Sequence, residues 1–359
     1  MFVGGCVTMQ IQADTLEKKP RLYAVEFLRI FFVFFIIFGH IMQMYPDIKS
    51  SVYNFLNSDL VPTWFCVEYY SIIGGFFIYR NCLKNKNLFD SIKHVYMRLF
   101  PAVFFLYLIA LINGLARIHM LPIILTMTQG ISIPIADAIG WGDWFAGAYF
   151  WASCFCISLL FYLKDKAFMF MIPLIYVLLV TQHHTTYPGW MKAYYGLIGS
   201  EFLRVLYCVC LGALASFGAQ NLTLPKDKFA RFLFTVLEVI LLYFCFRRIF
   251  YGNSVISMVA ITSFSLLLIL IANSAGIISS TLNKISQIHY LSRYSWSIFI
   301  GHAYWLTFFQ DRGSKLWFDD ATCGLIVGGG AILIGIFEYH IVEKRVVPWV
   351  CKYFQGDKQ

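Results

Sequence analysis

Charged residues are scarce in this sequence of 359 residues. They make up 13% of it, whereas soluble proteins carry about 25%, and 59% of the sequence is hydrophobic. The apolar residues come in long blocks, most of them near the length of about 20 residues that crosses a bilayer as a helix. The shortage of charge excludes an ordinary soluble protein. The net charge of +9 does not indicate nucleic-acid binding, because no soluble basic domain holds it.

The sequence also lacks internal repeats, low-complexity tracts and metal-binding spacings. Its 10 cysteines include Cys154, Cys156, Cys208 and Cys210, which lie inside apolar blocks, where cysteine behaves as a small hydrophobic residue. We therefore expect no metal site and no structural disulfide framework. The missing repeats argue against the many transporters that are built from repeated halves.

The hydropathy pattern predicts an all-α fold, a polytopic membrane bundle of about ten transmembrane helices. We expect a cytoplasmic segment at 1–21, a transmembrane domain at 22–345 and a cytoplasmic tail at 346–359. The predicted spans are 22–44, 62–83, 99–121, 143–163, 167–183, 200–219, 229–247, 254–274, 291–310 and 323–345.

The distribution of Lys and Arg predicts the orientation. With the N-terminus in the cytoplasm, 19 of the 28 basic residues fall in inner segments and 6 in outer loops. This bias fits the positive-inside rule with both termini cytoplasmic, and an even number of spans agrees with it. The expected location is the cytoplasmic (inner) membrane of the cell, with Arg29 toward the inner leaflet and His40 toward the outer one.

Three ionisable residues occur in the first span. On a helix, Arg29 and His40 lie within roughly 20° of one face and about 16 Å apart along the axis, and Glu26 lies about 60° from Arg29. Such groups are costly in a membrane unless they face protein or water, so they are functional candidates. His40 fits a general base or a hydrogen-bonding link between helices. Glu26 and Arg29 fit an ion pair or a pocket for a substrate.

Several motifs, in order, resemble the membrane acyltransferase 3 family. Its first helix reads D-x-L-R-G followed by an apolar run and His; here Glu26-Phe-Leu-Arg29-Ile30 precedes His40. The other matching blocks are Gly74-Gly75-Phe76, Arg98-Leu99-Phe100-Pro101, Asp143-Trp144-Phe145, Arg204 with Leu211-Gly212, Ser292 to His302, and Glu343-Lys344. The departures are Ile30 for Gly, Gly74 for Ser, Val95 for the first Arg of R-x-x-R, and Arg345 for Pro.

This resemblance implies an enzyme that transfers an acyl group, most simply acetyl from acetyl-CoA, to a hydroxyl of a cell-surface glycan or lipid-linked sugar precursor. It implies His40 as the catalytic base, taking the hydroxyl proton directly or first accepting the acyl group itself. The residues it implies around the donor are Glu26, Arg29, Arg98, Arg204 and His302.

Other interpretations of these residues and of the function stay open. Glu68, on the span expected beside the first, is a candidate to orient His40, or it pairs with an arginine. The rival interpretation of Arg98 is an anchor at the cytoplasmic surface. The alternative function is a transporter or flippase for a sugar or a lipid-linked substrate. Expected partners are the glycan acceptor, membrane lipids and enzymes of polysaccharide synthesis, with no nucleic acid.

Overall fold

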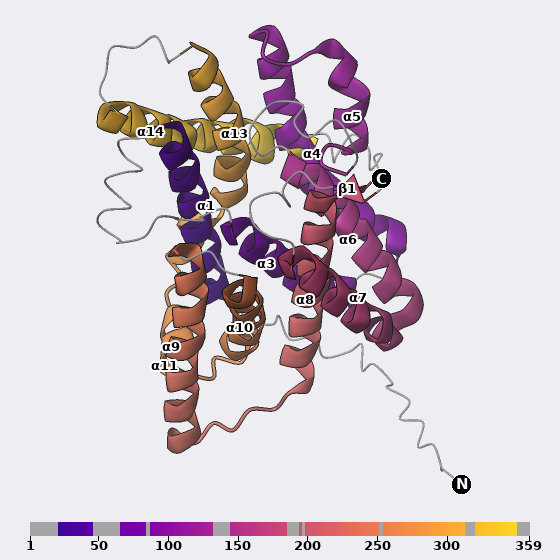
Figure 1. Ribbon diagram of the computed structural model, residues 1–359, viewed down its shortest axis with the longest axis vertical. Coiled ribbons are helices and arrows are strands. Elements are labelled where there is room, and N and C mark those ends of the chain that lie inside the picture. The colour runs from indigo at the N-terminus through magenta and orange to yellow at the C-terminus, as the bar shows by residue number, and fades with distance from the viewer. Residues whose placement is uncertain are drawn as a thin grey trace.

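A computed structural model describes residues 21–45, 65–83, 87–131, 144–184, 194–195, 198–250, 254–312 and 320–349. Nearly all of these residues are helical (Figure 1). Within the described ranges, the one sheet is a two-residue antiparallel pairing of β1 (Tyr194–Tyr195) with β2 (Ile198–Gly199). The fold is an all-α bundle, as the sequence predicted.

A helix occupies each of the ten predicted ranges. The long helices are α1 (Tyr23–Met44), α3 (Cys66–Cys82), α4 (Leu88–Ile112), α6 (Trp144–Leu163), α7 (Ala167–His184), α8 (Ser200–Asn221), α9 (Lys228–Phe250), α10 (Ser254–Ala272), α13 (Ser295–Arg312) and α14 (Asp320–Glu338). Short helical segments are η2 (Ile118–Met120), α5 (Leu121–Thr126), η3 (Lys164–Lys166), α11 (Ile277–Leu282) and α12 (Ile288–Ser292).

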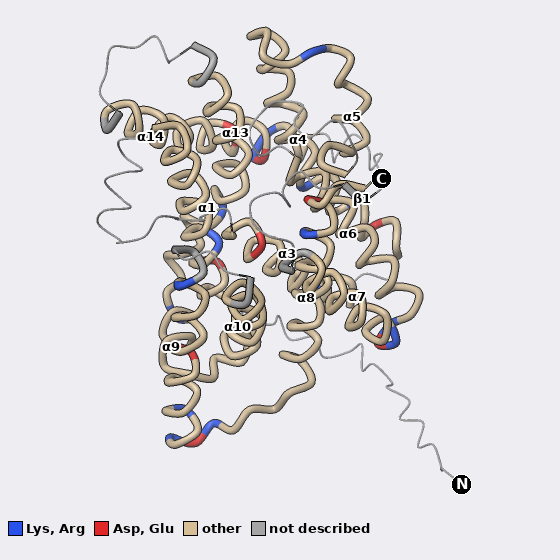
Figure 2. The backbone as a smooth tube through the Cα atoms, in the orientation of Figure 1, with Lys and Arg blue, Asp and Glu red and all other residues tan. Residues whose placement is uncertain are grey.

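The length and composition of these helices make this a multi-pass membrane protein. Among the described residues, five helices are long and apolar enough to cross a bilayer: α1, α4, α8, most of α9, and the helix from Thr322 to Trp349. Charged residues are sparse along the helical parts of the chain (Figure 2). The count of about ten spans stays a prediction, and the predicted terminal segments lie largely outside the described residues.

Helix α4 begins eleven residues before the predicted span at 99–121. Its first turn is capped by Asn87, whose side chain accepts a hydrogen bond from the backbone N–H of Phe89 at 3.0 Å. The early turns contain Lys93, His94 and Arg98, and these polar residues lower the local hydropathy below that of a membrane span. The helix therefore extends beyond the apolar segment, and its early turns present basic side chains at the end of the bundle.

Helix α3 lies in the middle of the bundle, between α1 and α8 (Figure 1). Twelve of its 17 residues are buried. Gly75 and Gly212 allow the close approach of α3 and α8, because a Cβ atom at either position would overlap a backbone carbonyl of the other helix, that of Val209 or of Ile72. This contact fixes the position and rotation of α3. It therefore also determines which side chains of α3 face α1, α6 and α13.

The chain leaves α14 through a π-helical segment, η6 (Tyr339–Val346), which packs against α4. Glu343 of this segment accepts a hydrogen bond from the hydroxyl of Ser297 on α13 at 2.6 Å. The last helix is thereby tied to the neighbouring helix. π-Helical turns are uncommon and occur often at functional sites.

Candidate active site

Helix α1 contributes to two polar sites at different depths. At one end, Nη2 of Arg29 donates a hydrogen bond to the hydroxyl of Tyr70 on α3 at 3.3 Å, and the guanidinium carbon lies 5.6 Å from that ring's centroid. About 16 Å further along the helix axis, the ring of His40 stacks on the ring of His302 from α13, with centroids 5.4 Å apart. The structure thus gives Arg29 and His40 separate partners on separate helices.

A small cavity, here called the arginine cavity, lies beside Arg29 between α1, α3, α4, α6 and α13. Its volume is about 50 Å³, which is room for a few water molecules. Its polar lining residues are Arg29, Tyr70, Asn81, His94, Arg98 and Tyr149. Arg98 and His94 are exposed, so the cavity reaches the protein surface at the early turns of α4.

The charges around the arginine cavity favour an anionic ligand. The guanidinium groups of Arg29 and Arg98 lie close enough to repel each other, and both are attracted by the carboxylate of Glu343. Two guanidinium groups beside one cavity are suited to the oxygens of phosphate or carboxylate groups, which they bind with charge-assisted hydrogen bonds.

His40 and His302, here called the histidine pair, form the second polar site. Nδ1 of His302 makes a short hydrogen bond to the backbone carbonyl of Phe299. Since a carbonyl only accepts, this nitrogen carries the proton, and Nε2 has a free lone pair. That Nε2 atom is buried and has no hydrogen-bond partner among the described residues. A neutral imidazole of this kind can accept the proton of a hydroxyl group.

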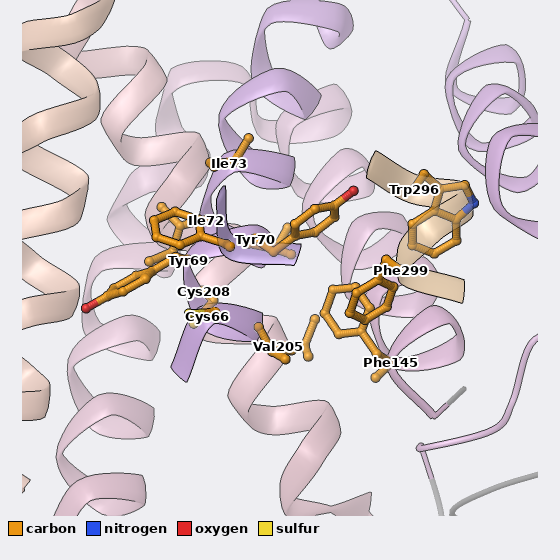
Figure 3. Close-up of a cluster of buried hydrophobic side chains, with 14 of the residues drawn as sticks. Cys66, Tyr69, Tyr70, Ile72, Ile73, Phe145, Val205, Cys208, Trp296 and Phe299 are labelled. Atoms are coloured by element: carbon orange, nitrogen blue, oxygen red, sulfur yellow. The ribbon is translucent and has the colours of Figure 1, made fainter. Parts of the chain in front are cut away.

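A cluster of aromatic rings lies between the two polar sites, and we call it the aromatic cluster. Phe299 is its centre: its ring centroid is 5.6 Å from Tyr70, 5.0 Å from Phe145, 5.8 Å from Trp296 and 5.3 Å from His302. Figure 3 shows Tyr70 extending from α3 toward Trp296 and Phe299. Tyr70 and Trp296 also line the arginine cavity. In this conformation the aromatic rings separate the cavity from the histidine pair.

A comparison with protein families matches the family described as "Acyltransferase domain" to residues 22–337. The chain belongs to the membrane acyltransferase 3 family. The matched range contains all the lining residues of the arginine cavity and both histidines. No curated protein and no solved structure matches the chain. Membership makes the protein a membrane acyltransferase, and it implies an acyl donor.

Two departures of this acyltransferase from the family pattern lie in the wall of the arginine cavity. Val95 stands where the family's first arginine is expected, and Gly74 stands where a serine is expected; both residues line the cavity. With Val95 on α4, the described lining holds two arginines, Arg29 and Arg98. Gly74 lies in another wall of the cavity, on α3, and the tip of Tyr149 takes the space beside it.

Glu68 and Arg204 contact each other. The sequence had suggested that Glu68 orients His40 and that Arg204 binds the donor. Nε of Arg204 donates to Oε1 of Glu68 at 2.7 Å, and the Tyr207 hydroxyl reaches the same oxygen at 3.4 Å. Their side chains are only 2% and 1% exposed. The ion pair joins α8 to α3, which fits the alternative of an arginine partner for Glu68. A role of Glu68 in orienting His40 stays a prediction.

Glu26 lies in the first turn of α1 and faces α12. It accepts a hydrogen bond from Arg21 at 2.6 Å and one from the hydroxyl of Ser292 at 2.9 Å, and His289 lies 3.5 Å away. The described contacts of Glu26 therefore tie α1 to α12, while Arg29 on the same helix reaches the arginine cavity. Glu26 does not line that cavity.

The structure adds two tyrosines to the site that the sequence did not single out. Tyr70 and Tyr149 line the arginine cavity beside the arginines. Their sequence signal is weak, because tyrosine is common in membrane helices and neither residue belongs to a motif. Tyr70 comes two residues after Glu68, so the two side chains lie on different faces of a helix. This spacing does not show that Tyr70 faces Arg29.

Proposed function

We propose that this membrane acyltransferase moves an acetyl group from acetyl-CoA to a hydroxyl of a cell-surface glycan or of a lipid-linked sugar precursor. One observation supports the proposal best: α1 contributes Arg29 to an anion-attracting cavity and the half-buried His40 to a histidine pair, at two depths of one bundle. Acetyl-CoA enters from the cytoplasmic side, where basic residues are concentrated. The sugar hydroxyl approaches the histidine pair from the opposite side.

The donor is held mainly by Arg29 and Arg98. Coenzyme A carries phosphate groups, and two guanidinium groups at a surface-connected cavity can bind their oxygens in bidentate fashion. Glu26 and Arg204 support the site by holding α1 against α12 and α3 against α8. His302 supports it from the other end by stacking on His40.

In the transfer, the sugar oxygen attacks the thioester carbon. The new C–O bond forms as the C–S bond breaks, and the hydroxyl proton passes to the imidazole of His40 and then to the thiolate of coenzyme A. A positioned general base of this kind contributes a rate factor of about 10² to 10⁴. An alternative order, in which His40 first accepts the acetyl group, uses the same residues.

The aromatic cluster lies on the route between donor and acceptor. The described cavity is smaller than the arm of coenzyme A requires, so Phe299 and its neighbours have to move before the thioester meets the histidine pair. The enzyme works in the cytoplasmic membrane with both termini inside. Membrane lipids and enzymes of polysaccharide synthesis are its proposed partners.

The deciding experiment is acetyl transfer in proteoliposomes with labelled acetyl-CoA. Purified protein is incubated with a crude fraction of lipid-linked sugars, and label in the glycan is measured by mass spectrometry. The His40→Ala variant is expected to lose activity by about a hundredfold or more, because the imidazole assigned to take the hydroxyl proton is then missing.

The matched control is His119→Ala, since His119 is exposed on η2 and lines no part of the site. His119→Ala should transfer acetyl at the wild-type rate. Wild-type transfer by His40→Ala would refute the role given to His40. Movement of a sugar substrate across the membrane with no acetylation by the wild-type protein would favour the transporter instead.

A further inference from the structure

Tyr149 of α6 fills the space next to Gly74 in the wall of the arginine cavity. A Cβ atom built on Gly74 would overlap the hydroxyl of Tyr149 and lie 2.6 Å from its Cζ atom. The tip of the tyrosine therefore occupies the volume that a side chain at position 74 would take. Any larger residue at this position has to push the tyrosine aside.

The position of the Tyr149 ring is well defined. It stacks on Phe145, one helical turn earlier, with centroids 5.7 Å apart and planes 23° apart. The backbone of the same residue is bound one turn later, where the Ser153 hydroxyl donates to its carbonyl at 2.6 Å. The ring thus points into the cavity from a rigid helix.

Tyr149 lines the same cavity as both guanidinium groups. It interacts electrostatically with Arg98 and, more weakly, with Arg29. The hydroxyl of Tyr70 binds Arg29 on another side. Two cations and two phenol hydroxyls therefore converge on one small cavity from four helices.

We propose that Tyr149 is a donor-binding residue of this acyltransferase, and that Gly74 is the residue that makes room for it. The inference rests on the proposed function, because it assigns Tyr149 to the same acyl-CoA. Its phenol donates a hydrogen bond to a phosphate oxygen that Arg29 and Arg98 attract. A hydroxyl that donates to an anionic oxygen forms a charge-assisted bond, which is stronger than a bond between neutral groups.

Equilibrium binding of labelled acetyl-CoA to the purified full chain in nanodiscs tests this assignment. Tyr149→Phe keeps the ring and its stacking on Phe145 but removes the hydroxyl, so we expect about tenfold weaker binding. Gly74→Ser should weaken binding as well, because it displaces the ring. The matched control is Tyr162→Phe on the same helix, where the ring is exposed, and its affinity should equal that of the wild type.

A second ligand identifies the contacted group. S-Acetylpantetheine has the thioester and the arm but no phosphate, so Tyr149→Phe should leave its affinity unchanged. Equal acetyl-CoA affinity of Tyr149→Phe and wild type overturns the inference, and so does an equal loss for both ligands. If the wild type binds no acetyl-CoA, the proposed donor itself is wrong, which is a separate result.

Discussion

The buried pair of Glu68 and Arg204 illustrates how a charge becomes tolerable inside a membrane bundle. Removing one member of such a pair leaves an uncompensated buried charge, whereas replacing both members with neutral groups is often harmless. The two residues are 136 positions apart in the chain. Their described ion pair spans the interface between α3 and α8. The attraction between the two charges offsets the free energy that each loses when it is removed from water.

We therefore expect Arg204→Met to lower the free energy of unfolding by about 3 kcal/mol, since the Glu68 carboxylate would lose its cation. Adding Glu68→Gln to this variant should recover most of the loss. Thermal unfolding in detergent, followed by circular dichroism, measures both. A double variant no more stable than Arg204→Met would contradict this account.

The same double variant separates the two roles considered for Glu68. If Glu68 only pairs with Arg204, the stabilised double variant should regain acetyl transfer together with its stability. If it is well folded but slow, Glu68 also acts on His40. Activity and unfolding measured on one preparation distinguish these results.

At the level of helices, the sequence was most informative about where they lie. Each predicted range contains a helix, because long apolar blocks in a membrane protein leave few alternatives. The start of α4 was missed, because the part of a helix that extends beyond the apolar layer no longer has a high mean hydropathy. Lys93, His94 and Arg98 are helical yet polar, and the capping contact at Asn87 is local.

Contacts between helices were harder to predict. The histidine pair joins α1 to α13, and the arginine cavity gathers side chains from five helices. A single sequence gives the face of each helix but not which face meets which. Arg29 and His40 were found because they are ionisable residues within an apolar span, and Arg98 because of the family resemblance. Tyr70 and Tyr149 depend on packing alone.

The close approach of α3 and α8 predicts a strong effect of a single methyl group. Gly75→Ala would place a Cβ atom against the backbone carbonyl of Val209, which cannot rotate away. We expect the free energy of unfolding to fall by about 2 kcal/mol from overpacking. A lower thermal midpoint in detergent would show it.

The control for this prediction is Gly329→Ala on α14, where a Cβ atom meets no neighbour within 4 Å. This change should leave stability unchanged or raise it slightly, since alanine favours a helix more than glycine does. Equal midpoints for the two variants would argue against close packing at Gly75.

For the whole molecule, the asymmetric distribution of basic residues predicts the orientation in the membrane. A fluorescent protein fused after Gln359 should fold and fluoresce in the cytoplasm. Alkaline phosphatase fused after Thr126, beyond the third predicted span, should be active outside. The reverse pattern, a dark fluorescent-protein fusion after Gln359 and an inactive phosphatase fusion after Thr126, would invert the proposed paths of donor and acceptor.

The aromatic cluster has a further consequence for the cell. If donor and acceptor enter from opposite faces of an energised membrane, as proposed, the enzyme must not let protons cross. In the described conformation, the ring of Phe299 packs against Tyr70 of the arginine cavity, against Phe145 and against His302 of the histidine pair. Such packing would oppose the passage of protons in the resting protein and so preserve the membrane potential. A leak of small ions could then arise only in the brief interval when the rings move apart to admit the donor.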